Sequence, residues 1–428
     1  MRPWTMMNDK QKKIWTWLEA LGHPEKGKKI VHLVGTNGKG STGTFIAAIL
    51  NTLSDRVGHF TSPHVLRYNE RIRINLEPVS DADLAGADLR IRALRDRFGL
   101  DELFYFERSL IEALILFEEM DWLVMEAGVG GKNDITNVLT ADYTVISPIS
   151  MDHMDKLGYS LEEIAAQKAE VITAGRPVIS SFQRPEVAAV LDRFARGRNS
   201  EIRYLQPDQI RRTAIFSEGL SLKKSPAEDD RGILKRRPVM RYSWAGSPES
   251  ALAGEYESQL VGDHQLENLG VAMLFAERLG LSDRAGVRQA IKKATIPGRM
   301  QLIWDQPQIW IDGAHNDRAV EVLLQNFDLL AIDKPVLIFG MHKGKISSGM
   351  QKRLFSAASA CYFVEVEGKS DEEIREAVSD RLRSLFKEGN RKPVLICGSL
   401  YILGAANDYL MSRSTVEEEG TNFAHERE

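Results

Sequence analysis

Short apolar runs alternate with longer amphipathic stretches along most of the chain. The apolar runs, rich in Val, Ile and Leu, predict buried strands, whereas apolar residues recurring every three or four positions predict helices. Strands that alternate with helices indicate a parallel, doubly wound α/β sheet. In the first part of the chain we expect strands at 30–34, 122–126, 143–149 and 177–181, and helices at 10–21, 81–98, 109–119, 160–173 and 184–195.

The pattern changes between about residues 200 and 260. Short alternating pieces and a charged insert at 227–237 predict a small antiparallel subsheet with an exposed loop. Helices are then expected at 265–279 and 284–294.

A Pro-Gly break at 296–300 is followed by a second series of strands and helices. The expected domains are therefore 1–297, with the small subsheet, and a smaller Rossmann-like α/β domain at 298–428. Its polar tail, from about residue 412, is expected to be disordered. The expected strands are 308–312, 335–339, 360–366 and 393–397, and the expected helices are 318–327, 346–357, 371–387 and 399–411.

Composition limits the classes of protein that fit. The chain has 428 residues, 43% of them hydrophobic and 27% charged, which is typical of globular proteins with two or three domains. A net charge of −4 without a basic stripe argues against a nucleic-acid partner. No apolar run is long enough to span a membrane, so we expect a cytoplasmic protein. The two cysteines, Cys361 and Cys397, lie in apolar runs and are expected to be buried thiols.

A glycine-rich loop follows the first expected strand and carries the clearest chemistry. In the run 31–42, Gly35, Gly38 and Gly40 would let backbone N–H groups approach phosphate oxygens. Lys39 supplies a cation, and Ser41 or Thr42 a hydroxyl suited to Mg²⁺. The loop thus predicts a P-loop-type nucleotide site. Lys39 is followed by Gly40 rather than directly by Ser or Thr, so a glycine-rich turn without a nucleotide is the alternative.

Carboxylates and a histidine follow two other expected strands. Glu126 ends one strand and precedes a flexible stretch, and Asp152 and His153 follow the strand at 143–149. Ligands of open α/β sheets bind at this edge, so these residues are candidate ligands. Alone, Glu126 could equally be a capping or ion-paired residue and His153 a structural one. Lys168, taken alone, reads as a surface lysine of its helix.

Taken together, these motifs resemble the folylpolyglutamate synthase/dihydrofolate synthase branch of the Mur ligase family. The resemblance runs from about residue 20 to residue 411, with the motifs in the family's order. The matching stretches are 35–42, 61–64, 69–73, 126–131, 134–137, 152–153, 157–158, 167–169, 264–268, 297–299, 312–316 and 398–401.

The resemblance implies an ATP-dependent amide ligase. A substrate carboxylate would attack the γ-phosphate, and the amino group of L-glutamate would attack the resulting acyl phosphate. It further implies a monomer that uses ATP, two Mg²⁺ ions and a monovalent cation, with L-glutamate and a pterin- or folate-type acid as substrates.

The family's residue roles carry over to matching positions. The catalytic residues would be Lys39, His153 and Lys168, the last of them carbamylated. The ligands of the two Mg²⁺ ions would be Ser41, Ser62, Glu126, His153 and Lys168. The nucleotide would be bound by Gly35, Thr36, Asn37, Gly38, Lys39, Gly40, Ser41, Thr42, Asn268, Arg299 and Asp312. The substrates would be bound by Phe106, Glu107, Asp152, His315 and Ser399.

Several positions depart from the family's pattern. Lys132, Glu170 and Asp317 replace usual residues, as does the stretch 341–344, and the segment 7–13 lacks the usual Leu-Gly-Leu and Arg. That segment helps to hold the pterin in the family. A paralogous ligase that joins an amino acid to a different carboxylic acid is therefore the main alternative to a folate ligase. A non-catalytic nucleotide-binding protein is a third, against which the intact Lys39, Ser41, Glu126, His153 and Lys168 argue.

Overall fold

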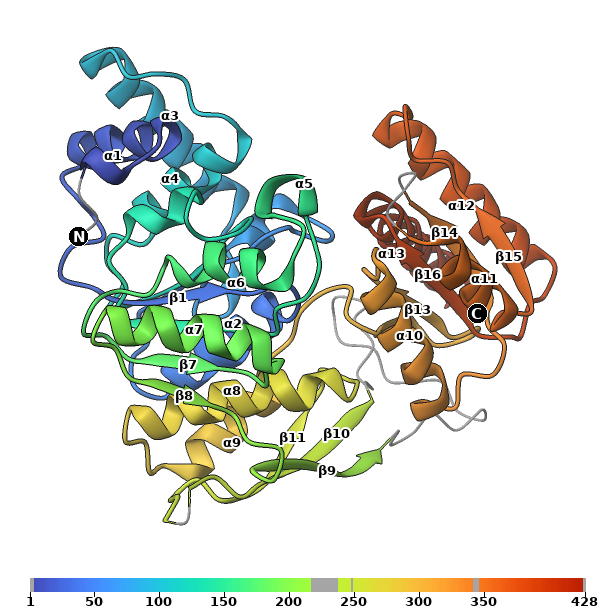
Figure 1. Ribbon diagram of the computed structural model, residues 1–428. Coiled ribbons are helices and arrows are strands. Elements are labelled where there is room, and N and C mark those ends of the chain that lie inside the picture. Colours follow the sequence, from blue (N-terminus) through green and yellow to red (C-terminus); the bar gives the residue numbers. More distant parts are fainter. Residues whose placement is uncertain (1–3, 217–237, 248, 342–345, 426–428) are drawn as a thin grey trace.

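The computed structural model describes residues 4–216, 238–247, 249–341 and 346–425. Two α/β units stand side by side, and a small sheet lies beneath the larger unit (Figure 1). This is the expected fold class, a doubly wound, mostly parallel sheet followed by a smaller α/β domain, and it is confirmed.

The larger sheet has eight strands in the order β4-β3-β2-β5-β1-β6-β7-β8. Neighbours from β2 to β8 run parallel, whereas β3 and β4 form an antiparallel edge. The carboxyl ends of β2, β5, β1 and β6 therefore meet at one edge. The strands are β1 (Lys29–Val34), β2 (Val57–Phe60), β3 (Ile72–Ile74), β4 (Glu77–Pro78), β5 (Trp122–Glu126), β6 (Tyr143–Ile146), β7 (Val178–Ser180) and β8 (Ile202–Tyr204).

Helices cover both faces of this sheet. Val31 and Leu33 of β1 pack with α2 and α8, whereas Ile30, on the opposite face, packs with α1 and α4. Helix α2 is apolar on nearly all sides because it lies between the sheet and α8. The helices are η1 (Trp4–Met6), α1 (Asp9–Leu21), α2 (Lys39–Leu50), η2 (Tyr68–Arg71), α3 (Asp81–Phe98), α4 (Tyr105–Leu116), η3 (Ile135–Val138), α5 (Met154–Leu157), α6 (Leu161–Ala169), α7 (Pro185–Gly197), α8 (His264–Arg278) and α9 (Arg284–Lys293).

The expected antiparallel subsheet is present but starts later than predicted. It consists of β9 (Ile210–Phe216), β10 (Val239–Trp244) and β11 (Gly254–Ser258), in the order β11-β10-β9. β8 lies in the same stretch of sequence but pairs in parallel with β7 in the large sheet. The charged insert at 227–237 lies outside the described residues.

The second unit is a five-stranded sheet in the order β12-β13-β16-β14-β15. Only the β12–β13 pairing within it is antiparallel. Its strands are β12 (Gln301–Trp304), β13 (Ile309–Asp312), β14 (Val336–Gly340), β15 (Ala360–Phe363) and β16 (Val394–Gly398), and its helices are α10 (Asp317–Leu329), α11 (Ser348–Ser356), α12 (Asp371–Lys387) and α13 (Leu400–His425).

Two expectations about this unit are wrong. Helix α13 continues to His425, through the stretch from 412 that the sequence predicted to be disordered. Cys361 is exposed, although Cys397 is buried as expected. Cys361 lies on β15, the edge strand of the sheet, and an edge strand is covered less completely than a central one. Within the described residues, no helix is long and apolar enough to cross a membrane.

Buried histidines make the large unit sensitive to acid. His59 on β2 is buried, and neither of its ring nitrogens has a hydrogen-bond partner among the described residues. Burial lowers the pKa of His59 to about 3, an effect to which the Arg73 guanidinium adds. Burial likewise lowers the pKa of His32 to about 4. At these two histidines the unfolded chain therefore binds more protons than the folded chain below about pH 6.5.

We expect the thermal unfolding midpoint to fall as the pH drops from 7.5 to 5.5. Each such histidine should cost about 1.4 kcal/mol per pH unit below its unfolded pKa. Glu267, whose pKa burial raises to about 7, acts in the opposite direction, so the comparison must be between variants. His59→Leu should show a smaller fall in midpoint than the wild type over this range. An identical pH dependence in the two proteins would contradict the role given to His59.

Candidate active site

The glycine-rich loop lies at the carboxyl edge of the large sheet, between β1 and α2. Gly35 has φ 150°, and a Cβ there would overlap the Ser147 side chain. Gly38 has φ 86° and caps α2, and a Cβ there would overlap the Asn268 side-chain oxygen. The backbone N–H of Thr36 donates to the carbonyl oxygen of Pro148 at 2.9 Å. Glycine is therefore required twice, because neighbouring strands and helices press against the loop.

Lys39, the first residue of α2, folds back over this loop. Its Nζ donates to the carbonyl oxygens of Gly35 (3.3 Å) and Thr36 (3.4 Å). The same nitrogen lies 3.9 Å from Oε1 of Glu126. A cation at the N-terminus of a helix suits a bound anion.

Glu126 ends β5 and is buried beside Lys39. Its Oε2 accepts hydrogen bonds from the Thr61 hydroxyl and, at 3.3 Å, from the Ser62 backbone N–H. Burial raises the pKa of Glu126, and the positive charge of Lys39 is the largest of the opposing effects. The carboxylate at the end of β5 is thus held by groups from the ends of its two neighbouring strands, β1 and β2.

Hydroxyls at the start of α2 are fixed by α8. Ser41 Oγ accepts from Gln265 Nε2 at 3.3 Å, and Thr42 Oγ1 donates to Asn268 Oδ1 at 3.3 Å. Gln265 and Asn268 also bond to each other at 2.9 Å. They lie three residues apart, on the same face of α8, so one helix face orients both hydroxyls.

Lys168 is buried on α6, which excludes a surface lysine. Its Nζ donates to the Gly35 carbonyl oxygen at 2.7 Å. Burial lowers the pKa of Lys168 to about 7, and the charge of Lys39 adds to this effect, while Asp152 and Asp134 oppose it. Lys168 therefore reaches the nucleotide loop as an amine that is partly neutral at physiological pH.

Asp152 and His153 lie at the same edge, before α5. His153 has φ 45° and caps α5, and its Nε2 is 3.8 Å from Oδ2 of Asp152. The His153 side chain is about one-third exposed, at 37%. The His153 side chain is therefore accessible to a ligand that approaches from solvent.

The start of the second unit carries a further group of predicted residues. Asp312 ends β13, and its carboxylate accepts the backbone N–H groups of Met300 (2.8 Å) and Ala314 (2.9 Å). The charge of Arg299 acts on both Asp312 and Glu126, so Arg299 links the two units electrostatically. His315 Nδ1 lies 2.7 Å from the Gly313 carbonyl oxygen. Ser399 follows β16, the strand next to β13, and its N–H donates to the Gly340 carbonyl oxygen at 2.6 Å.

Phe106 and Glu107 belong to the first turn of α4, which starts earlier than predicted because Glu107 caps it. Glu107 Oε2 accepts the Phe104 backbone N–H at 2.9 Å. A Cβ at Gly128 would be 2.7 Å from the Phe106 ring, so this ring lies against the loop that follows Glu126. Phe104 is 70% and Tyr105 58% exposed. The exposed rings of Phe104 and Tyr105 therefore lie next to the buried carboxylate of Glu107.

The donor set suits magnesium better than a transition metal. Among the described residues, no group of three or more His, Cys, Asp or Glu side chains is arranged to hold a metal ion. Mg²⁺ commonly takes only one or two protein carboxylates and completes its shell with hydroxyls, waters and phosphates. Glu126 and the Thr61 hydroxyl meet this description, and a Cβ at Gly40, next to Ser41, would be 3.6 Å from Oε2 of Glu126.

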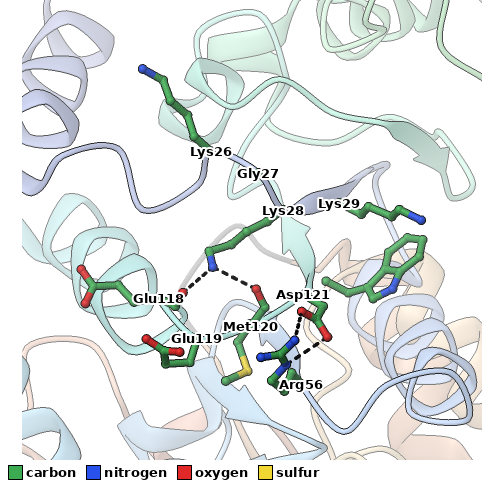
Figure 2. Close-up of a pocket in the computed structure, with 10 residues that line it drawn as sticks. Lys26, Gly27, Lys28, Lys29, Arg56, Glu118, Glu119, Met120 and Asp121 are labelled. Carbon is green, nitrogen blue, oxygen red and sulfur yellow. Dashed lines mark hydrogen bonds and ion pairs between the residues drawn. The ribbon is translucent and has the colours of Figure 1, made fainter.

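A cavity of about 430 Å³ lies away from this site, at the opposite edge of the sheet (Figure 2). Its lining includes Lys29 and Trp122, the first residues of β1 and β5. Two of the cations there have partners within the protein: Lys28 Nζ donates to the Glu118 and Met120 carbonyl oxygens, and Arg56 pairs with Asp121 at 2.6 Å. The candidate site is therefore the loop edge and not this cavity.

Comparison with known proteins identifies the family. No protein-family model matches the chain. The chain is 32% identical to a Bacillus subtilis dihydrofolate synthase/folylpolyglutamate synthase in an alignment 420 residues long. The alignment covers 90% of the chain and 91% of that protein. The chain belongs to the folylpolyglutamate synthase/dihydrofolate synthase family.

Solved structures of this family share the fold. The apo form of Lactobacillus casei folylpolyglutamate synthase (FPGS) matches with a TM-score of 0.76 at 28% identity, over 94% of this chain and 95% of that one. An FPGS–AMPPCP–folate complex matches with a TM-score of 0.76 at 29% identity, over 94% of each chain.

Three departures from the folylpolyglutamate synthase/dihydrofolate synthase pattern have structural partners here. The Lys132 backbone N–H donates to the Gln167 carbonyl oxygen, Glu170 pairs with Arg198 at 2.5 Å, and Asp317 accepts the Ser347 N–H at 2.9 Å. Of the stretch 341–344, residues 342–344 lie outside the described residues.

Sequence reasoning missed two side chains at this candidate site. Thr61 binds Glu126, and Gln265 binds Ser41. Both lie in stretches that carry the family resemblance, beside or one helical turn from a predicted residue. That spacing is the signal that could have identified them.

The lack of room for a side chain at Gly35 predicts that substitution by alanine lowers activity. Gly35→Ala should lower ATP turnover at least 100-fold, because the added Cβ must displace Ser147 or distort the loop around Lys39. Gly22→Ala is the matched control, since Gly22 also has positive φ, at 77°, but no atom lies within 4 Å of a Cβ there. Steady-state ADP release measures both. Equal loss in the two variants would show that backbone strain rather than crowding of the loop is responsible.

Proposed function

We propose that this protein is an ATP-dependent ligase that adds L-glutamate to the carboxyl group of a folate or of dihydropteroate. The single observation that carries the proposal is the meeting of Lys39, Glu126 and Lys168 at the glycine loop of a chain in the folylpolyglutamate synthase/dihydrofolate synthase family. The relatives' names give both activities, and a related FPGS structure holds AMPPCP and folate.

The reaction would proceed in two displacement steps. A carboxylate oxygen of the acid forms a bond to the γ-phosphorus, and the bond between that phosphorus and the β,γ-bridging oxygen breaks, which releases ADP. The glutamate amine then forms a bond to the acyl carbon, inorganic phosphate leaves, and the nitrogen loses a proton. Lys39 and the N-terminus of α2 would neutralise charge that develops on the transferred phosphoryl group.

The remaining roles follow the family's assignments. Glu126, Ser41 and Ser62 would hold one Mg²⁺ and His153 a second, and bound Mg²⁺ would neutralise phosphate charge. Arg299 would contact the phosphates from the break between units, with Asn268 at the adenine and Asp312 at the ribose. His315 and Ser399 would face glutamate, and Phe106, Glu107 and Asp152 the acid. A monovalent cation, a monomeric state and a cytoplasmic location are further predictions from the sequence.

The mass of the product identifies the acid to which L-glutamate is joined. With ATP, Mg²⁺ and L-glutamate, we expect dihydropteroate or a reduced folate to gain one glutamyl unit, detected by mass spectrometry. The control is Lys39→Ala, which should form no product because it lacks the cation that faces the γ-phosphate. Turnover of an unrelated carboxylic acid, with none of any pterin acid, would instead identify a paralogous ligase.

Lys168 is proposed to carry a carbamate. Its neutral amine would attack CO₂, forming an N–C bond and releasing a proton, so that a buried cation becomes an anionic oxygen donor. In ¹³CO₂-equilibrated buffer with Mg²⁺ and ATP, we expect a carbamate ¹³C resonance in the wild type and none in Lys168→Ala. Lys168→Ala should also be nearly inactive, and a short carboxylic acid in solution should restore part of its rate. A wild type without the resonance would contradict the proposal.

A further inference from the structure

Gln11, in the first turn of α1, is completely buried although it is polar. Its side-chain Nε2 donates to the carbonyl oxygens of Lys132 (2.9 Å) and Asp134 (2.8 Å). Its Oε1 accepts the backbone N–H of Asn8 at 3.2 Å, so the amide is used at both ends. The residues that Gln11 binds lie in the loop that follows Glu126. Helix α1 is therefore fixed to this loop by hydrogen bonds that water cannot readily replace.

Lys13, two residues later, binds the start of α4, which carries the proposed acid-binding residues Phe106 and Glu107. Its Nζ pairs with Oε2 of Glu107 at 2.5 Å, where the two side chains are only 13% and 5% exposed. The same nitrogen donates to the Glu102 carbonyl oxygen at 3.0 Å and lies 4.4 Å from the centre of the Phe104 ring. One cation thus joins α1, the 101–104 segment and the capped start of α4.

These contacts connect three elements around the aromatic residues 104–106: helix α1, the start of α4 and the 128–134 loop. Phe106 lies against Gly128, next to the loop that Gln11 binds, and Glu107, its neighbour, binds Lys13. Asp134 continues the connection, since its carboxylate accepts the Val129 N–H at 2.9 Å. The spacing between the start of α4 and the 128–134 loop is therefore set by two side chains of α1.

The nucleotide loop is held chiefly by other elements, although Glu126 and Lys168 connect it to the loop after β5. Residues 35–42 contact Pro148, Ser150 and Asn268, which belong to the segment after β6 and to α8. A change in α1 should therefore alter the acid site more than the nucleotide site.

We infer that Gln11 and Lys13 are positioning residues that set the affinity for the acid substrate without contacting it. The inference rests on the proposed function, because the surface beside Phe106 is the proposed acid site. The first turn of α1 holds the two walls of that site, the start of α4 and the 128–134 loop, at a fixed spacing. Segment 7–13, which departs from the family's pattern, thereby contributes to acid selection through its buried side chains.

The test separates acid binding from catalysis. Gln11→Ala and Lys13→Met should each raise KM for the pterin acid roughly tenfold, with kcat and the KM values for ATP and L-glutamate changed less than about twofold. Lys13→Arg should restore the wild-type KM, because a guanidinium can also pair with Glu107. The matched control is Lys12→Met, since Lys12 pairs only distantly, at 3.8 Å, with the exposed Asp9 and should leave all constants unchanged.

Hydrogen–deuterium exchange gives a readout that needs no turnover. In Gln11→Ala and Lys13→Met, peptides covering 100–110 and 128–138 should exchange faster, and the peptide covering 35–50 should not change. Equal exchange in variant and wild type, or a KM for ATP that rises with that for the acid, would overturn the inference. A wild type that forms no glutamyl product with any pterin acid would instead overturn the proposed function, and the exchange result would still decide the positioning role.

Discussion

The candidate site depends on one buried carboxylate. Glu126 lies at the end of β5, where removing a charge from water costs several kcal/mol unless other groups compensate. Lys39, Thr61 and Ser62 provide that compensation from the ends of the neighbouring strands β1 and β2. The carboxylate therefore fixes where α2 begins and where the loop after β2 runs. These are also the groups that we propose bind the nucleotide phosphate and its metal ion.

Close backbone packing gives Lys168 its unusual surroundings. A Cβ at Gly131 would be 2.6 Å from the Gln167 carbonyl oxygen and 2.9 Å from Cα of Lys168. Because the loop after β5 and helix α6 approach so closely, Lys168 is buried and its amine is directed to the Gly35 carbonyl oxygen. The close packing of α6 therefore has two effects on Lys168: burial lowers the pKa of its amine, and the amine is placed at the glycine-rich loop.

The loop after β2 also connects the two units. At one end Ser62 bonds to Glu126, and a few residues later Val65 packs in the core of the second unit, where a Cβ at Gly298 would be 2.5 Å from its side chain. Glu70 holds this loop by accepting the backbone N–H groups of Val65, Leu66 and Arg67. A shift of the second unit would therefore reach Glu126 through a short and well-bonded segment.

Local sequence patterns determined the positions of many of the helices and strands. Helices α3 and α12 and strand β5 have the predicted bounds, because a capping serine precedes each of these two helices and a continuous apolar run marks the strand. The sequence likewise predicted that the glycine loop, Glu126 and His153 follow neighbouring strands of one sheet, whereas only the family resemblance, and not the local pattern, gave Lys168 a role. The short strands β2, β3 and β8 were not predicted, since a Gly, His or Arg interrupts the apolar run in each of them. Only the tertiary structure decided that Lys168 is buried, that Cys361 is exposed and that Gln11 joins α1 to the 132–134 segment. Burial depends on which distant segments pack together, and the periodicity of a single segment does not contain that information.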